Sequence, residues 1–317
     1  MRKNELSALL QLEDFSEVYH KADQIREKTK GREVQIRAIL EFSNICTRKC
    51  SYCGIQMGNH HVKRYRMKEH EIIETARRAS DAGYRTIVLQ SGEDPYFTAK
   101  RLGDIVGEIK KTGMAVTLSC GEMSYEDYRY LKQCGADRYL LKQETSDPDL
   151  YALLHPCGTL ENRIACLKNL KKLGYETGSG FMIGLPGQTL DTIAQDILLL
   201  QEIGCDMAGI GPFIPHPQTP LASHPAGSTE LTKRAVALSR IVMPELNLPA
   251  TTALAVLNGG KRSDVFSCGA NVVMKKVTPA EYQYLYEIYP ANMTDTDIEK
   301  DRRELEQKII QLDRIPV

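Results

Sequence analysis

The sequence has neither net charge nor a long apolar stretch. Lysine plus arginine and aspartate plus glutamate number 41 each among 317 residues, so the charge balance indicates no nucleic acid and no membrane surface as a partner. No apolar run approaches the ~18 residues that a membrane-spanning helix needs. The N-terminal residues form no amphipathic, arginine-rich or apolar leader. We therefore expect a cytoplasmic protein whose cysteines are reduced.

A fourth cysteine is also missing from the most prominent motif. Cys46, Cys50 and Cys53 are separated by three and then two residues. Three thiolates at this spacing can bind one face of a four-iron cluster and leave one iron open to a small molecule. A structural zinc site, with four ligands in two pairs, would need His60 or His61 as a fourth ligand. A disulfide framework is disfavoured because three neighbouring cysteines cannot all pair among themselves.

Strand-like and helical segments alternate along most of the chain. The expected strands cover residues 34–42, 86–90, 115–119, 138–142, 176–184, 207–210, 249–255 and 268–274. The expected helices between them cover residues 67–82, 102–111, 125–134, 161–173, 190–203 and 229–243. Eight such repeats predict an α/β fold, a closed (β/α)8 barrel of the TIM type. The alternative, an open doubly wound sheet, would carry a glycine-rich loop where the cysteines stand.

The expected boundaries make the whole chain, residues 1–317, a single domain. Residues 1–32 have helical periodicity and form a helical lead-in. Residues 33–275 form the barrel, and residues 276–317 form a C-terminal helical cap. Functional residues of such a barrel lie at the C-terminal ends of its strands, so polar motifs at those positions are the candidates for its site.

Polar motifs do follow the expected strands. Gln90 and Glu93 follow the second strand, Ser119 ends the third, and Glu144 follows the fourth. Arg163, in the next helix, could pair with Glu144 or bind a carboxylate through its guanidinium fork. Each motif alone could also be an ordinary polar turn or an exposed ion pair of little consequence. A glycine-rich stretch at residues 178–189 would let a ligand approach the backbone closely.

The cysteine spacing, with Tyr52 directly before the third cysteine, resembles the signature of the radical S-adenosylmethionine (SAM) enzymes. The resemblance implies one 4Fe–4S cluster on the three cysteines, with SAM on the open iron. Reductive cleavage of SAM would then give a 5′-deoxyadenosyl radical. The positions that the resemblance assigns to SAM binding are Tyr52, Gln90, Glu93, Ser119, Glu144 and Arg163.

Longer blocks are similar to the FeFe-hydrogenase maturases of the HydE type, and more distantly to biotin synthase and methylornithine synthase. These blocks are residues 42–54, 64–67, 89–96, 176–189, 209–221, 249–253 and 268–273. The resemblance implies a role in H-cluster assembly on a cysteine-bound iron carbonyl cyanide species. It also implies reduced ferredoxin or flavodoxin as electron donor, and other hydrogenase maturases as partners. The implied substrate contacts are Lys142, Gln143, Met207, Thr251, Thr252, Tyr286 and Tyr289.

Two departures from that family leave the substrate open. The chain has no cysteine after Cys268, so an accessory cluster is expected to be absent. Lys142 and Gln143 stand where an arginine and a histidine are common, which changes the anion that the cavity can hold. A paralogue acting on another sulfur-containing or amino-acid substrate is therefore one alternative. A non-catalytic iron–sulfur protein is another, although it would not explain the ordered strand-end motifs. Tyr286 and Tyr289 could equally pack a cap.

Overall fold

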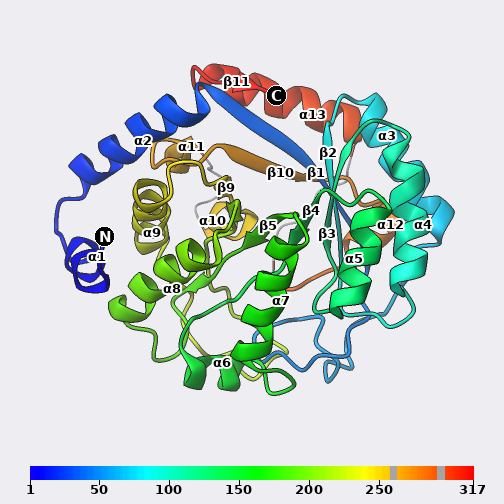
Figure 1. Cartoon of the computed structure of the whole chain (residues 1–317), viewed down its shortest axis with the longest axis horizontal. Helices are drawn as coiled ribbons and strands as arrows, with labels where there is room; N and C mark the ends of the chain where they lie inside the picture. The colour runs from blue at the N-terminus through cyan, green and yellow to red at the C-terminus, as the bar shows by residue number, and fades with distance from the viewer. Residues whose placement is uncertain (258–262, 291–296) are drawn as a thin grey trace.

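The computed structural model describes residues 1–257, 263–290 and 297–317. Eight parallel strands form a nearly closed barrel, with helices around its outside (Figure 1). The strands are β1 (Glu33–Ser43), β2 (Thr86–Ser91), β3 (Ala115–Ser119), β4 (Arg138–Leu140), β5 (Glu176–Ser179), β7 (Met207–Ala208), β9 (Pro249–Ala250) and β10 (Val272–Lys276). Their order in the sheet is β7-β5-β4-β3-β2-β1-β10-β9.

The two end strands of that order, β7 and β9, are joined by a short parallel bridge. Met207 pairs with Asn247, just before β9. The amide of Ala208 donates to the carbonyl of Asn247 at 3.0 Å, and the amide of Asn247 donates to the carbonyl of Asp206 at 2.9 Å. Because these bonds close the ring, the predicted barrel is confirmed and the open doubly wound sheet was the wrong alternative.

The helices of the barrel begin and end within three residues of their expected bounds. They are α3 (Glu69–Asp81), α4 (Ala99–Lys110), α5 (Tyr125–Gln133), α7 (Leu160–Lys172), α8 (Leu190–Ile203) and α9 (Thr229–Val242). Five of them begin after a serine or threonine whose hydroxyl accepts a hydrogen bond from a backbone N–H of the first turn. Such caps satisfy amides that the helix leaves unpaired, so the sequence marks these boundaries locally.

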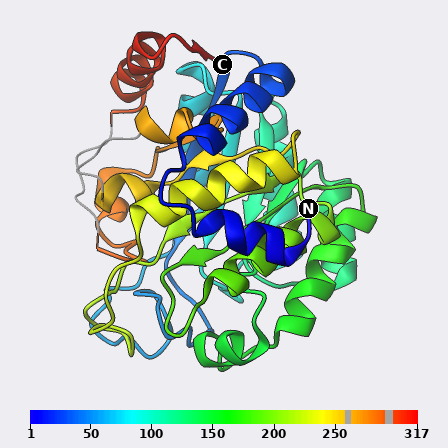
Figure 2. The same ribbon diagram turned by 90° about the vertical axis from the view of Figure 1, so that its left-hand side faces the viewer.

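The lead-in consists of α1 (Lys3–Leu10) and α2 (Ser16–Lys30). These helices lie over α8 and α9 of the outer ring (Figure 2), to which α1 contributes the buried Leu6 and Leu10. On α2, the buried Arg26 forms an ion pair with Asp23 at 2.7 Å. None of the helices in the described parts of the chain is long and apolar enough to cross a membrane.

Three expected strands differ from those observed. The stretch 176–184 divides into β5 and β6 (Met182–Ile183), and β6 pairs with β8 (Gly211–Pro212) in a separate two-stranded sheet. Gly180 explains the break, because its φ is +149° and a Cβ there would lie 2.2 Å from the carbonyl oxygen of Gly209. The stretch 249–255 leaves the sheet after Ala250 and becomes α10 (Thr252–Leu257). The last strand follows α11 (Ser263–Phe266) and begins later than expected.

The remaining elements lie outside the eightfold repeat. A short helix, α6 (Pro148–Leu154), was not expected; Asp147 caps it, and Pro148 occupies its first turn. The C-terminal cap contains α12 (Ala280–Gln283) and α13 (Ile298–Gln311), but it ends in a strand, β11 (Ile315–Pro316). This strand pairs with the first residues of β1. The prediction of a purely helical cap was therefore incomplete.

A buried carboxyl group gives the fold a pH dependence. Asp196 lies fully buried on α8, where its side chain accepts a hydrogen bond from the amide of Ser146. Burial raises the pKa of Asp196 to about 8, and nearby acidic groups add to the effect. The folded state therefore holds a proton between about pH 4 and pH 8 that the unfolded state releases. Stability contributed by that proton is lost as the pH rises through this range.

We predict that Asp196→Asn will gain in melting temperature, relative to the parent, as the pH rises from 5 to 8. The amide mimics the protonated acid and does not titrate. Asp191→Asn on the same helix is the control, because its exposed carboxyl has a lowered pKa and is ionised throughout this range. Thermal unfolding at both pH values is the measurement. A difference between Asp196→Asn and the parent that is the same at pH 5 and pH 8 would contradict the prediction.

Candidate active site

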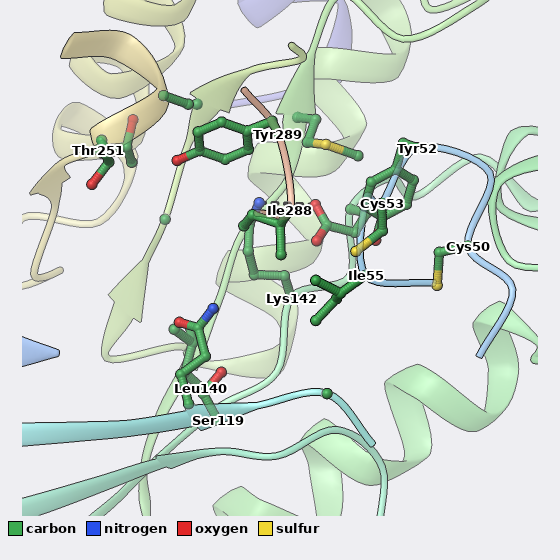
Figure 3. Close-up of a pocket in the computed structure, with 18 of the residues that line it drawn as sticks. Cys50, Tyr52, Cys53, Ile55, Ser119, Leu140, Lys142, Thr251, Ile288 and Tyr289 are labelled. Atoms are coloured by element: carbon green, nitrogen blue, oxygen red, sulfur yellow. Dashed lines mark hydrogen bonds and ion pairs between the residues drawn. The ribbon is translucent and has the colours of Figure 1, made fainter. Parts of the chain in front are cut away.

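A cavity of about 510 Å³ opens at the C-terminal ends of the barrel strands. All three cysteines of the motif line it. Figure 3 shows Cys50 and Cys53 on one side of this cavity and Thr251 on the other, with Tyr289 and Lys142 in view between them. The first strand leads into the cysteine loop, so the barrel itself brings the loop to the mouth, as the strand-end rule predicts.

One arginine organises the cysteine loop. Arg64 donates from Nη1 to the carbonyls of Asn44 and Ile55, both at 2.7 Å. From Nη2 it donates to the carbonyls of Gln56 at 2.7 Å and Asn59 at 3.1 Å. These carbonyls lie before and after the cysteines, so a single guanidinium fixes both ends of the loop. Sequence reasoning included Arg64 only in a matching block and gave it no role.

The loop after β2 lies directly against the cysteine loop. The amides of Arg48 and Glu93 both donate to the sulfur of Cys46, at 3.4 Å each. Gly92 permits this approach, because a Cβ at that position would lie 2.3 Å from the carbonyl oxygen of Ile45 and 2.7 Å from the Cβ of Cys46. Two N–H groups thus converge on one sulfur, an arrangement that stabilises a metal-bound thiolate.

The three thiols face the cavity from partly buried positions. Burial raises the pKa of the Cys50 thiol to about 12, and it also raises the pKa of Cys46 and Cys53. A bound cation reverses this effect, because coordination deprotonates the thiol. Across the described residues, no three Cys, His, Asp or Glu side chains gather closely enough to hold a single metal ion. In a four-iron cluster each thiolate binds its own iron.

Glu93 and Arg163 belong to one network of alternating charges. Arg48 donates to Glu93 at 2.6 Å and to Glu122 at 3.1 Å. Arg163 donates to Glu122 at 2.6 Å and to the carbonyl of Lys142 at 2.5 Å. The suggested pairing of Arg163 with Glu144 is not found. Arg163 lines the cavity beside the cysteines. It forms an ion pair with Glu122, a residue whose role the sequence did not reveal.

Glu144 lines the cavity but pairs with Lys142, whose Nζ lies 2.8 Å from its carboxylate. Its backbone has φ +64°, which is uncommon for a residue other than glycine. That conformation is held by a parallel bridge to Phe181, in which the amides of Glu144 and Met182 both bond across to the facing chain. Strain maintained in this way is typical of functional sites.

Two of the expected substrate contacts do not line the cavity. Gln143 is fully buried in the barrel wall, where its amide donates to the carbonyl of Asp196 and its oxygen accepts from Ser179, both at 3.2 Å. Met207 lies against Arg37, whose Nη1 is 2.9 Å from the methionine sulfur. Neither side chain contributes to the cavity surface.

The other expected residues do line the cavity. Tyr52 is hydrogen-bonded to His155 at 3.0 Å, and Gln90 donates to Tyr286 at 3.1 Å. Thr251 donates to the carbonyl of Ile210 at 3.3 Å. The remaining members of this set on the cavity surface are Ser119, Thr252 and Tyr289.

Helix α6 and the turn after it add Tyr151, which sequence reasoning missed, and His155, which it treated as a structural residue rather than a ligand. Tyr151 and His155 stack with ring centroids 4.2 Å apart, and both line the cavity. Burial lowers the pKa of His155 to about 3, so its imidazole is neutral near pH 7. Asp147 before α6 and Pro148 at its first position form a helix-start signal that could have revealed this element.

The radical SAM superfamily model matches residues 40–200. The chain belongs to the radical SAM superfamily. A HydE subunit of the [FeFe] hydrogenase maturase from Thermotoga maritima is 54% identical over 280 residues, which cover 88% of this chain and 80% of that protein. A 3-methylornithine synthase from Methanosarcina acetivorans is 26% identical over 98% of this chain and 88% of its own length. The protein is therefore a radical SAM enzyme and a close HydE homologue.

Solved structures agree on the fold. The crystal structure of methylornithine synthase (PylB) has a TM-score of 0.89 and 25% identity, covering 100% of this chain and 94% of that one. A structure of HydG, a maturase of the [FeFe]-hydrogenase, has a TM-score of 0.83 at 20% identity and covers 72% of that chain. Radical SAM membership implies a 4Fe–4S cluster and SAM. The three thiols that line the cavity and the N–H donors on Cys46 fit such a cluster.

A segment of the C-terminal cap lies on the cysteine loop and carries two cavity tyrosines, Tyr286 and Tyr289. The amide of Gly54 donates to the carbonyl of Ile288 at 2.9 Å. A Cβ on Gly54 would lie 2.2 Å from the carbonyl oxygen of Glu287 and 2.5 Å from the His216 ring. Because backbone cannot yield as a flexible side chain can, glycine is required where these two segments meet.

We predict that Gly54→Ala will lower the melting temperature and the iron content after anaerobic reconstitution, because the added methyl separates the cap segment from the cysteine loop. Gly58→Ala is the matched control in the same loop, where a Cβ meets only the flexible side chain of Gln56 at 3.0 Å. Thermal unfolding and iron assays on both variants are the measurements. Equal behaviour of the two variants would show that the close contact at Gly54 does not hold the segments together.

Proposed function

We propose that this enzyme cleaves SAM reductively and uses the resulting radical in H-cluster assembly, on a cysteine-bound iron carbonyl cyanide substrate. The observation that carries the proposal is that one cavity is lined by all three cysteines, with Cys50 and Cys53 on one side and Thr251 on the other, in a chain 54% identical to a HydE subunit. When bound, the cluster would supply one electron to split SAM into methionine and a 5′-deoxyadenosyl radical. The cavity would shield that radical from solvent.

The residues on the cysteine side would orient SAM. Arg163 lines the cavity, and its guanidinium suits the SAM carboxylate. Glu93 would receive the SAM ammonium, while Glu144 would accept from the ribose hydroxyls. Tyr52, Gln90 and Ser119 lie on the same cavity surface, where they would contact the nucleoside and methionine parts.

The opposite side would hold the substrate. Thr251 and Thr252 follow β9 and would bind a carboxylate of a cysteine-derived ligand. Tyr286 and Tyr289 come from the cap segment and would close the cavity over that ligand. Met207 and Gln143 would act only indirectly, through the barrel wall in which they lie.

A second candidate function rests on Lys142. This lysine lines the cavity and forms an ion pair with Glu144. A lysine presents a point charge, whereas an arginine presents a planar fork that binds anions bidentately. The substitution favours a paralogue that takes a different sulfur-containing or amino-acid substrate. For both candidate functions, reduced ferredoxin or flavodoxin would supply the electron. For the role in H-cluster assembly, other hydrogenase maturases would be partners.

We predict about four irons per chain after anaerobic reconstitution, the content of one 4Fe–4S cluster. Cys50→Ala should lose most of that iron together with SAM cleavage, because a three-ligand site has no spare thiolate. Cys134→Ala, at a half-buried position on the outer side of the barrel, is the control and should keep both. Iron analysis and chromatography of 5′-deoxyadenosine are the measurements. Full iron content and intact SAM cleavage in Cys50→Ala would contradict the assignment of the cluster to the three cysteines. A content of eight irons per chain would reveal an accessory cluster.

We predict that the iron–cysteine carbonyl cyanide precursor, supplied anaerobically with SAM and dithionite, will yield an adenosyl–substrate adduct or a low-spin iron radical. Electron paramagnetic resonance and mass spectrometry would detect these products. Release of 5′-deoxyadenosine with an unchanged precursor would instead favour the paralogue. Lys142→Arg should then move activity towards the maturase reaction, because residue 142 lines the cavity. Gln143→His is the control, because residue 143 faces the barrel wall.

A further inference from the structure

Glu122 is the buried acid between the two arginines of the site, and neither the sequence motifs nor the proposed function gives it a role. Its side chain is 6% exposed. One carboxylate oxygen accepts from Arg163 and the other from Arg48. The second oxygen also accepts from Asn162, at 2.7 Å. Its backbone amide donates to Glu93 at 3.2 Å, so Glu122 contacts every other charged member of the network.

Arg48 and Arg163 differ in how many N–H donors their hydrogen bonds to the protein leave for a ligand. Arg48 uses all three guanidinium nitrogens on the protein, for Glu93, the carbonyl of Cys157 and Glu122. Arg48 is therefore a brace between the cysteine loop and the loops that follow β2, β3 and α6. It is not in a position to give up a donor pair to a ligand without breaking one of those contacts.

Arg163 has donors to offer. A guanidinium carries five N–H groups. Within the described residues, Arg163 donates hydrogen bonds from Nε to Glu122 and from Nη1 to the carbonyl of Lys142, and its guanidinium lies over the ring of Tyr151 at 5.9 Å. The outer edge formed by Nη1 and Nη2 keeps N–H groups for a carboxylate in the cavity, which Arg163 lines. A bidentate bond requires that edge to be held at a fixed angle.

The backbone conformation at residue 121 makes this arrangement possible. Gly121, directly before Glu122, has φ +83°, and a Cβ there would lie 2.0 Å from the Cγ of Glu93. Glycine therefore allows the chain to bring the amide and the carboxylate of Glu122 to Glu93 and the arginines at once. Asn162, next to Arg163 on α7, fixes the carboxylate from the other side.

We propose that Glu122 is a positioning residue for the amino-acid end of SAM. It orients Arg163 so that the outer guanidinium edge meets the SAM carboxylate, and it supplies the negative charge that lets two partly buried arginines lie close together. This inference rests on the proposed function, since it takes SAM as the ligand of the cavity. Glu122 acts through Arg163 and does not itself contact the cofactor.

Glu122→Gln keeps the shape of the side chain but removes its charge and one acceptor. The new amide N–H groups would face a guanidinium, donor against donor, so Arg163 must turn away or lose its bond. Arg48 keeps its contacts with Glu93 and Cys157, so the cysteine loop stays braced. The variant should therefore assemble its cluster yet bind SAM poorly.

The test compares SAM dissociation constants of cluster-loaded protein, measured anaerobically by equilibrium dialysis. We expect Glu122→Gln to weaken binding about tenfold or more with iron content unchanged, and Glu122→Asp, which keeps the charge, to weaken it less. Glu126→Gln is the control, because this residue pairs with Arg129 on the surface. A shift in the electron paramagnetic resonance spectrum of the reduced cluster on adding SAM is a second readout, expected to need more SAM in the variant.

A double-mutant cycle with Arg163→Ala separates positioning from general destabilisation. If Glu122 acts through Arg163, Glu122→Gln should cause little further loss in the Arg163→Ala background. Binding by Glu122→Gln within twofold of the parent, or a full additional loss in the double mutant, would overturn the inference while leaving the proposed function standing. Failure of the cluster-loaded parent itself to bind SAM would instead overturn the proposed function and the inference together.

Discussion

The site depends first on one guanidinium. The cysteine loop forms little regular backbone pairing of its own, and Arg64 bonds four carbonyls of it from a single side chain. Carbonyls near the interior need partners, because unpaired polar groups are costly to bury. The positions of Cys46, Cys50 and Cys53 are thus set before any cluster binds. A preorganised set of thiols reduces the entropy lost when metal is captured.

A line of alternating charges then connects that loop to the barrel. Glu93, Arg48, Glu122 and Arg163 come from four different segments, and each is bonded to the next. Buried charges are tolerated when they are paired and hydrogen-bonded, and leaving one unpaired is strongly destabilising. The network therefore holds the mouth of the barrel in one arrangement. It also presents Arg163 to the cavity, where a zwitterionic ligand would meet it.

Much of the fold could be predicted from the sequence because its signals are local. Helix ends follow capping hydroxyls and glycines, as at Thr189 and Gly204 of α8. The break after Ser179 and the turn into α10 depend on how loops meet above the barrel, which periodicity does not report. For the site, the three cysteines and the strand-end residues named from the sequence line one cavity. Gln143 does not line the cavity, and alternation along an extended chain places it on the side opposite Lys142 and Glu144. The pairing of Glu122 with two arginines needed the folded structure.

The central claim is that SAM binds at the open iron of a three-cysteine cluster inside this cavity. The most direct test is pulsed magnetic resonance of the reduced cluster with SAM labelled at its methionine amino nitrogen and carboxylate oxygen. The account predicts hyperfine coupling of both labels to the cluster, as expected when those groups chelate one iron. A cluster that forms on the three cysteines yet shows no coupling to either label would contradict it.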